Sequence, residues 1–451
     1  MNNMFYERDV TMNIRLFNAR ILTMEEGRAV FEGECWIKDE TILFVGDEND
    51  LEQFYKKSPD LCIVWDQEID CYKNLLMPGF KNAHTHSGMT ILRSYADDMP
   101  LQNWLFDQVF PIEGKLNGED VYYLTQLAIL EYLTSGITAI FDMYLTPFTI
   151  AQACIDMGMR CVQVGSINRF GPDLATIEKE YIELNKLHPL SSYILGFHAE
   201  YTCDKELLES VSALAHRYKA PVFTHNSETE LEVKECIDRY GMTPTMFLDS
   251  LGMFDYGGGG YHCVHMTQED LELFKKKNLY VVTNPGSNTK LASGIAPINK
   301  MLEMEIPIAI GTDGPASNNC LDMFREMFLV TGLAKLREKD ASVVSADKVL
   351  KMATVHGAHA MGLHRADILA TDKLADLIMI DLSQPNMQPI HNIVKNIVYS
   401  GSKQNVKMTM IHGKILYQDG KFAAGEKVTE LYKKVDEIVE RVCHKGISGR
   451  N

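Results

Sequence analysis

The sequence predicts an α/β fold in which a (β/α)8 (TIM) barrel carries a small discontinuous β-sandwich domain built from both chain ends. Two observations predict the barrel. Strand-like apolar runs alternate with helical patterns across residues 77–373, and histidine or acidic side chains follow the ends of several of these runs. A third observation predicts the second domain, because short strand-like runs punctuated by glycines recur near both ends of the chain.

The β-sandwich domain is expected to combine residues 1–76 with residues 374–451, and the latter part also carries a charged helical tail. The N-terminal strand-like runs are 14–16, 20–24, 35–38 and 42–45. The C-terminal runs are 375–381, 396–399, 408–412 and 414–417, followed by the tail at about 427–443.

The barrel is expected to fill residues 77–373, with its first strand beginning just before that boundary. The predicted barrel strands are 75–86, 137–143, 160–166, 193–198, 221–226, 261–265, 279–283 and 307–312. Helical patterns between them include 120–134, 174–187, 205–218, 268–277 and 296–303. In such a barrel the active site lies at the C-terminal ends of the strands.

The composition limits the partners and the compartment. The chain has 451 residues and a formal net charge of -17, which argues against a nucleic-acid backbone or an anionic membrane surface as the main partner. No apolar run reaches the length of a membrane span, and the first residues, MNNMFYERDVTM, do not resemble a signal peptide. The ten cysteines form no CxxC pair, so we expect free thiols in a reducing cytoplasm.

The first barrel strand ends in a pair of histidines. His84 and His86 are two residues apart, and residues i and i+2 of a strand point to the same side, so both imidazoles could bind one metal ion. An HxH pair alone is a weak signal, since two ordinary histidines near a turn give the same pattern.

The fifth predicted strand ends in His225, which would supply a third imidazole. Glu228 follows three residues later and could protonate a leaving group or a ring nitrogen. The alternative is that Glu228 only stabilises the start of a helix through the helix dipole.

The sixth and eighth strands add two more groups. His262 could orient an attacking water, whereas His265 is three residues away and is expected to point elsewhere. Asp313 could both bind the metal and accept a proton from the water, although a helix N-cap aspartate would have the same context. Three imidazoles and one carboxylate suit Zn²⁺, and Fe²⁺ would also fit. Such an ion lowers the pKa of water and so favours hydrolysis.

With these clusters in place, the chain resembles the amidohydrolase superfamily. It is most similar to the branch of methylthioadenosine/S-adenosylhomocysteine deaminases, which is related to triazine chlorohydrolases and guanine deaminases. The motifs that carry the resemblance are PGFKNAHTH, HNSETE, HCVHMT, NPGSNTKLASGIAP and GTDGPASNN. The resemblance implies one metal ion per subunit, bound by His84, His86, His225 and Asp313. It also implies that Glu228 protonates the purine ring and that His262 polarises the attacking water.

The resemblance further implies a nucleoside pocket. In LQNWLFDQVFPIE, Trp104 matches a residue that lines the pocket and Glu113 matches one that grips the ribose hydroxyls. His198 resembles a histidine near the sugar, and Arg169 could replace the arginine that binds the homocysteine carboxylate, which has no clear match here. The alternatives are a core Trp104, a solvated Glu113 and an ordinary strand-end His198.

The expected reaction is therefore metal-dependent hydrolytic deamination of an adenine nucleoside: adenosine, 5'-deoxyadenosine, 5'-methylthioadenosine or S-adenosylhomocysteine. Because the carboxylate-binding arginine is missing, the substrates that lack a carboxylate fit better. Guanine deamination and triazine dechlorination by the same metal site are the alternatives. The resemblance also implies a homo-oligomer.

Overall fold

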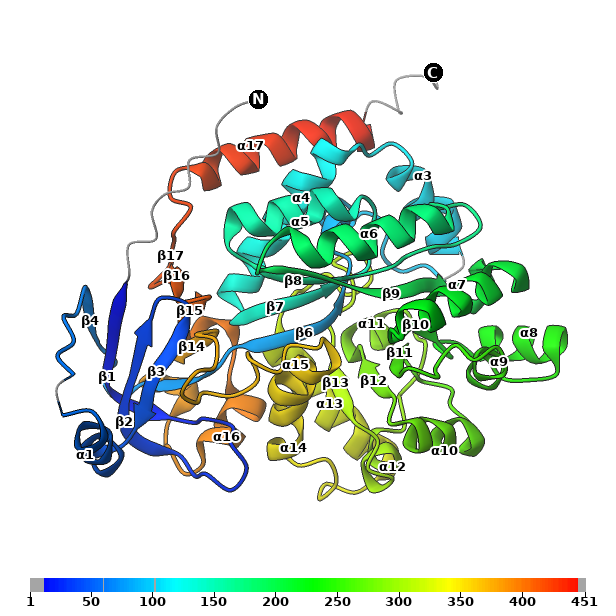
Figure 1. Ribbon diagram of the computed structural model, residues 1–451. Coiled ribbons are helices and arrows are strands. Elements are labelled where there is room, and N and C mark those ends of the chain that lie inside the picture. Colours follow the sequence, from blue (N-terminus) through cyan, green and yellow to red (C-terminus); the bar gives the residue numbers. More distant parts are fainter. Residues whose placement is uncertain (1–11, 60, 101–102, 445–451) are drawn as a thin grey trace.

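The computed structural model describes residues 12–59, 61–100 and 103–444, so residues 101 and 102 of the predicted LQNWLFDQVFPIE segment lie outside the described residues. Its centre is a sheet of eight strands that follow one another in chain order, each parallel to the next (Figure 1). The strands are β6 Phe80–Thr85, β7 Ile137–Asp142, β8 Arg160–Val164, β9 Ser191–Ala199, β10 Val222–Asn226, β11 Gly258–His262, β12 Tyr280–Thr283 and β13 Ile308–Ile310.

The barrel closes between its first and last strands. Just beyond β13, the backbone N–H of Asp313 donates to the carbonyl of His84 on β6 (3.0 Å), and the N–H of Thr312 donates to the side chain of Asn82 (2.9 Å). This contact brings two of the predicted site residues together and confirms the predicted (β/α)8 barrel.

Helices cover the outside of the barrel and begin where the sequence provides capping residues. The predicted helices 174–187, 205–218 and 268–277 coincide with α6 Leu174–Leu187, α7 Lys205–Tyr218 and α10 Gln268–Lys277. Asp173, Asp204 and Thr267 cap them by accepting hydrogen bonds from the first turn. The other helices of this region are α4 Gly118–Thr134, α5 Pro147–Met157, α8 Glu230–Tyr240, α9 Pro244–Ser250, α11 Pro285–Lys290, α12 Ile298–Glu303, α13 Met323–Glu338, α14 Ala346–Lys351 and α15 Gly357–Ala360.

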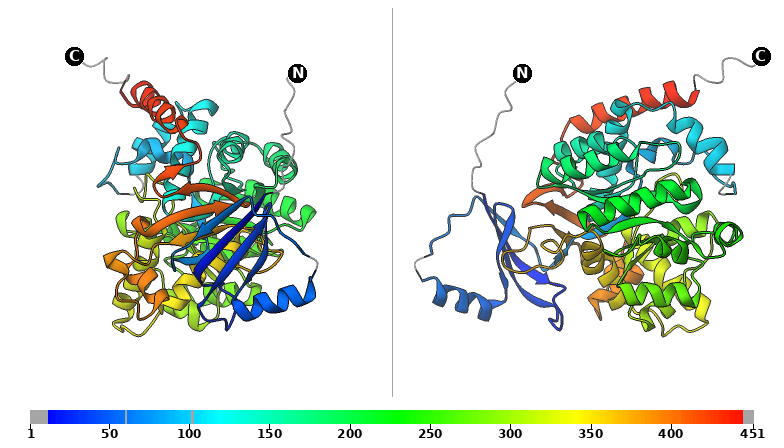
Figure 2. Two further views of the ribbon diagram at one scale, coloured as in Figure 1. Left: turned by 90° about the vertical axis from the view of Figure 1, so that its left-hand side faces the viewer. Right: turned by 45° about the vertical axis from the view of Figure 1, so that its right-hand side comes forward.

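A second sheet is built from both chain ends, as expected, and is mixed. Its strand order is β17-β16-β15-β14-β5-β1-β2-β3, with β4 paired to β1. The strands are β1 Asn13–Ile21, β2 Phe31–Lys38, β3 Thr41–Gly46, β4 Gln67–Asp70, β5 Leu75–Pro78, β14 Leu377–Ile380, β15 Val406–Ile411, β16 Lys414–Gln418 and β17 Lys421–Phe422. The two chain ends meet where β5 pairs antiparallel with β14. This sheet stands beside the barrel (Figure 2).

Two further helices belong to the chain ends. α1 Glu48–Lys57, which the sequence reading did not include, follows β3. α17 Lys427–Val439, in the predicted tail, lies along α4 on the outside of the barrel (Figure 2). No helix within the described part of the chain combines the length and the apolar character that a membrane span requires. The residue boundaries expected for the two domains stay a prediction.

Several predicted strands differ from the structure. The predicted strand 75–86 is two strands, β5 and β6, divided at Gly79, where a Cβ atom would lie 2.1 Å from the Thr138 side chain. The predicted runs 14–16 and 20–24 are one strand, β1, with an irregularity around Asn18 at φ +54°. The predicted strand 396–399 is wrong, because Asn396–Ser400 forms a helical turn. Short apolar runs such as Ile397-Val398 do not distinguish a strand from a buried helical turn.

Candidate metal centre and substrate pocket

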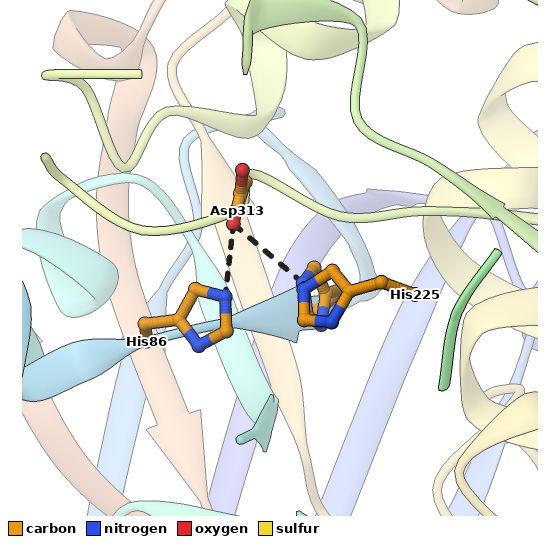
Figure 3. Close-up of side chains that lie close together, drawn as sticks. His86, His225 and Asp313 are labelled. Carbon is orange, nitrogen blue, oxygen red and sulfur yellow. Dashed lines mark hydrogen bonds and ion pairs between the residues drawn. The ribbon is translucent and has the colours of Figure 1, made fainter. Parts of the chain in front are cut away.

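Four side chains that the sequence singled out converge at the C-terminal end of the barrel. One ligand atom from each of His84, His86, His225 and Asp313 lies within 4.8 Å of the others, and all four residues are buried. His84 Nε2 is 3.2 Å from His225 Nε2 and 3.6 Å from Asp313 Oδ1, while His86 Nε2 is 3.1 Å from the same oxygen. Figure 3 shows His86 and His225 on two sides of Asp313.

Backbone carbonyls fix the orientation of two of these imidazoles. His225 Nδ1 donates to the carbonyl of His198 (2.7 Å), and His86 Nδ1 donates to the carbonyl of Met143. Because a carbonyl only accepts, both rings donate from Nδ1 and turn Nε2 into the cluster. Nε2 of the neutral His225 presents a lone pair there, whereas Nε2 of His86 faces Asp313 Oδ1. His84 is held instead by stacking on Tyr261, with ring centroids 3.8 Å apart.

The protonation states match a cation site. Burial lowers the pKa of His84 and His225 well below the ordinary value, and the neighbouring histidines lower it further, so both rings are neutral. Burial acts in the same direction on His86, but its hydrogen bond and charge interaction with Asp313 outweigh burial and raise its pKa to about 9. Burial raises the pKa of Asp313, but the interactions with His86 prevail and hold it well below the ordinary value, so Asp313 is a carboxylate.

The donor set fits a divalent metal. Nitrogen lone pairs and a carboxylate oxygen that face one another in a buried space need a cation between them, and three imidazoles with one carboxylate are typical ligands of such ions. Asp313 is itself held in place: Oδ2 accepts from Ser317 Oγ (2.7 Å) and Oδ1 from the N–H of Gly314 (2.8 Å). The four residues therefore form a candidate site for a divalent metal ion.

Glu228 lies beside this site as a buried acid. Its side chain is 9% exposed, Oε1 accepts from Ser293 Oγ (3.2 Å), and Oε2 is 3.8 Å from His262 Nε2. Burial raises the pKa of Glu228, and the charge of Asp313 adds to this, whereas His262 opposes it. A carboxyl group whose pKa is raised holds its proton more readily and can donate it to a substrate.

His262 faces the same space from the end of β11. Its backbone φ is +68°, which ends the strand there rather than at the predicted residue 265. Its Nδ1 lies 2.7 Å from Asn288 Oδ1, which only accepts, so His262 donates from Nδ1 and presents Nε2 to Glu228. His265 points elsewhere, as expected, and contacts the carbonyl of Ser293 (2.7 Å).

The sequence reading missed three residues that support the site. Ser317 holds Asp313, Asn288 holds His262, and Glu232 accepts from the N–H groups of Ser227 (2.9 Å) and Glu228 (2.8 Å). A sequence signal existed for Glu232, because Thr229 and Glu232 have the S/T-x-x-E spacing of a capping box and form one at the start of α8.

A cavity of about 690 Å³ opens from the metal centre to the surface. The candidate substrate residues Trp104, Glu113, Arg169 and His198 all line it, together with Glu228 and His262. Trp104 is 6% exposed and lies in the helical turn Trp104–Val109, which packs against α3 Phe110–Glu113. Burial lowers the pKa of His198 to about 4, so this ring is neutral beside the cavity.

Glu113 and Arg169 differ in their burial and in their hydrogen bonds. Glu113 Oε1 is buried without a hydrogen-bond partner among the described residues, and burial raises the pKa of Glu113 to about 7, although Tyr144 and His86 oppose the shift. Arg169 lies at the exposed rim, where it donates to the carbonyl of Tyr201 (2.8 Å) and stacks over Phe170. Glu113 is thus directed to a ligand, whereas Arg169 is partly engaged by the protein itself.

The chain is similar to known proteins over most of its length. The model of the amidohydrolase family matches residues 75–416. The chain is 39% identical over 408 residues to a 5-methylthioadenosine/S-adenosylhomocysteine deaminase from Desulforamulus reducens, covering 89% of this chain and 92% of the relative. It is 37% identical over 381 residues to the protein of the same name from Pyrococcus furiosus, covering 82% and 91%.

Among solved structures, an adenosine deaminase from Xanthomonas campestris with bound zinc is similar at a TM-score of 0.88 and 29% identity. The match covers 96% of this chain and 98% of that one. An atrazine chlorohydrolase from Arthrobacter aurescens complexed with zinc has a TM-score of 0.84 at 19% identity, covering 94% and 100%, and shares the fold.

Proposed function

The chain belongs to the amidohydrolase family, and from this premise we propose that it is a zinc-dependent deaminase of adenine nucleosides. The products are ammonia and the corresponding inosine-type nucleoside. The observation that carries the proposal is the position of the buried acid Glu228 next to a three-histidine, one-aspartate site, at the inner end of a cavity that Glu113 also lines. The names of the relatives support the substrate class.

The four residues His84, His86, His225 and Asp313 would hold one Zn²⁺ per chain. When bound, the ion lowers the pKa of water and so supplies the nucleophile for C6 of the purine at neutral pH. His84 and His225 are neutral and Asp313 is ionised, which suits this role because metal ligands bind in their deprotonated forms; His86, whose pKa is raised by Asp313, would lose its proton when the ion binds.

The protein side chains would then move the protons. Glu228 gives its proton to the ring nitrogen N1 while oxygen adds to C6, which removes the charge that would otherwise build up on the ring. Asp313 accepts the proton that the water loses and passes it to the exocyclic amine. The C6–N bond breaks while the hydroxyl on C6 gives up its second proton, which restores the acid form of Glu228, and ammonia leaves. His262, oriented by Asn288, holds the attacking water in line with C6.

The far part of the cavity would bind the sugar. A carboxylate that accepts from two neighbouring hydroxyls is suited to a ribose, and Glu113 has the unpartnered oxygen for this role. Trp104 and His198 would line the nucleoside. Arg169 would remain available at the rim for a charged 5' substituent, although its contact with Tyr201 favours substrates without a carboxylate.

Glu113→Gln tests the substrate class against a free-base deaminase or a triazine hydrolase with the same metal site. The variant should lower kcat/KM for adenosine about 10- to 100-fold, because one charged acceptor is lost, whereas in a free-base deaminase or a triazine hydrolase the same change would leave kcat/KM unaffected. Activity with guanine or a triazine alone would contradict the proposal. Homo-oligomer formation and a cytoplasmic location stay predictions.

A further inference from the structure

Tyr144 is a buried tyrosine that lines the cavity but has no role in the proposed reaction. The residue follows β7, two positions after its last residue Asp142, and is 5% exposed. Its hydroxyl is buried and has no hydrogen-bond partner among the described residues, although buried tyrosine hydroxyls usually have one.

The ring of Tyr144 is placed by a glycine. A Cβ atom on Gly88 would lie 2.2 Å from Cε1 of the tyrosine, so only glycine allows the ring to pack at this position. The chain beside Tyr144 is fixed as well, because the preceding carbonyl, of Met143, accepts from His86 Nδ1. The ring is therefore held between the metal centre and the cavity.

Glu113 lines the same cavity, and its Oε1 atom is also buried without a hydrogen bond of normal geometry to any described residue. The two side chains lie close enough for each to shift the pKa of the other through hydrogen bonding and charge, although no hydrogen bond of normal geometry joins them. Burial raises the pKa of Tyr144 well above its ordinary value, and the charge of Glu113 adds to this, so the tyrosine keeps its proton. A donor and an acceptor thus face the same part of the cavity, and neither is satisfied within the described protein.

We propose that Tyr144 is a specificity residue for the ribose diol, and that its hydroxyl donates to the oxygen of one ribose hydroxyl while Glu113 accepts the protons of both. The inference rests on the proposed function and adds a second recognition group to it. A ribose hydroxyl both donates and accepts, so a neighbouring donor and acceptor can satisfy a vicinal diol and be satisfied by it. A substrate without the diol leaves both buried groups unpaired, which penalises its binding.

The test compares wild type with Tyr144→Phe on adenosine, 2'-deoxyadenosine, 3'-deoxyadenosine and 2',3'-dideoxyadenosine. We expect kcat/KM for adenosine to fall about 10-fold, as for one lost hydrogen bond, and kcat/KM for the dideoxynucleoside to change less than about 2-fold. With one of the two monodeoxynucleosides, Tyr144→Phe should no longer lower kcat/KM. The hydroxyl that this substrate lacks is the one that Tyr144 binds.

A stability measurement separates recognition from a structural role. Because the hydroxyl has no partner in the protein, Tyr144→Phe should keep or raise the melting temperature. The matched control is Tyr122→Phe on the outer face of α4, whose hydroxyl donates to Asp156 (2.6 Å); it should leave all four kcat/KM values unchanged.

Equal losses on all four nucleosides, or no loss on adenosine, would overturn the inference. A wild-type protein that deaminates no adenine nucleoside would instead overturn the proposed function. If Tyr144→Phe does not fold, Gly88→Ala supplies the second test, because the added Cβ must displace the Tyr144 ring and should give the same diol-selective loss.

Discussion

At the scale of single residues, burial sets the protonation states that the reaction needs. It keeps His84, His225 and His198 neutral, and it raises the pKa of Glu228 and Glu113. Burial therefore favours the protonated form of the acid that must donate a proton, and it favours the neutral form of the imidazoles of His84 and His225 beside it.

Glu228→Gln tests the proton donor. The amide keeps the size and the Ser293 contact but cannot donate a proton to N1, so kcat should fall about 10²- to 10⁴-fold while the metal content is unchanged. Ammonia release and metal analysis on the same sample measure both. Glu230→Gln, an exposed carboxylate two residues along the chain, is the matched control and should retain full activity. Full activity in the Glu228 variant would remove this residue from the mechanism.

The pH dependence of kcat/KM tests Glu113. Its pKa of about 7 lies above the ordinary value, so the carboxyl is protonated below that pH and can no longer accept from both ribose hydroxyls. The value of kcat/KM for adenosine should fall as pH drops through about 7, by about tenfold per unit. In the Glu113→Gln variant, kcat/KM for adenosine should stay constant across this pH range. If kcat/KM of the variant still falls at acidic pH as it does in the wild type, another group causes the fall.

The metal cluster could be predicted from the sequence because its members stand at the ends of parallel strands, which meet at one end of a barrel. The residues that orient the site's side chains could not be predicted in this way. Ser317, Asn288 and Glu232 act through contacts across loops, and a serine or an asparagine in a loop has many other uses. The orientation of Tyr144 depends on the ring packing over Gly88, which no spacing in the sequence encodes.

At the scale of elements, the helices α6, α7 and α10 were predicted to the residue, whereas α4 begins two residues before its predicted start and several short strands have other limits than predicted. α6, α7 and α10 each begin after an Asp or Thr whose side chain accepts a hydrogen bond from a backbone N–H of the first turn. The division of 75–86 into β5 and β6 depends on a close contact between Gly79 and Thr138, which are distant in sequence. The strand predicted at 396–399 is wrong because the hydrophobic periodicity of so short an apolar run does not distinguish a strand from a helical turn.

A buried ion pair joins the two sheets and can be tested by mutation. Arg160 at the start of β8 makes two hydrogen bonds, of 2.6 and 2.9 Å, to Asp376 just before β14, and their side chains are 4% and 0% exposed. Asp376→Ala leaves the guanidinium buried without its partner, so the free energy of unfolding should fall by about 3–5 kcal/mol in urea titrations.

The matched control for Asp376→Ala is Asp419→Ala, which breaks the exposed pair with Lys407 and should change the free energy of unfolding by less than about 1 kcal/mol. Similar small effects for both variants would show that the Arg160–Asp376 pair does not hold the two sheets together.

At the scale of the whole molecule, the metal centre ties β6, β10 and the segment after β13 together where the barrel closes. Removal of the metal should therefore lower stability as well as activity. At a free ion concentration 100 times Kd, a bound ion adds about 2.7 kcal/mol to the free energy of unfolding. Dialysis against a chelator should lower the melting temperature and the activity, and added Zn²⁺ should restore both.

His86→Ala supplies the control for this prediction, because a variant with one ligand removed should show a smaller change in melting temperature between chelator and Zn²⁺. A melting temperature of the wild type that does not respond to the chelator would contradict a metal site at the barrel closure.

The most direct test of the central claim is ammonia release by the zinc-loaded protein. Adenosine, 5'-deoxyadenosine, 5'-methylthioadenosine, S-adenosylhomocysteine, adenine and guanine would be compared under identical conditions. The proposed function predicts turnover of nucleosides and none of the free bases, with the substrates that lack a carboxylate ahead of S-adenosylhomocysteine. Turnover of guanine or adenine without turnover of any nucleoside would contradict it.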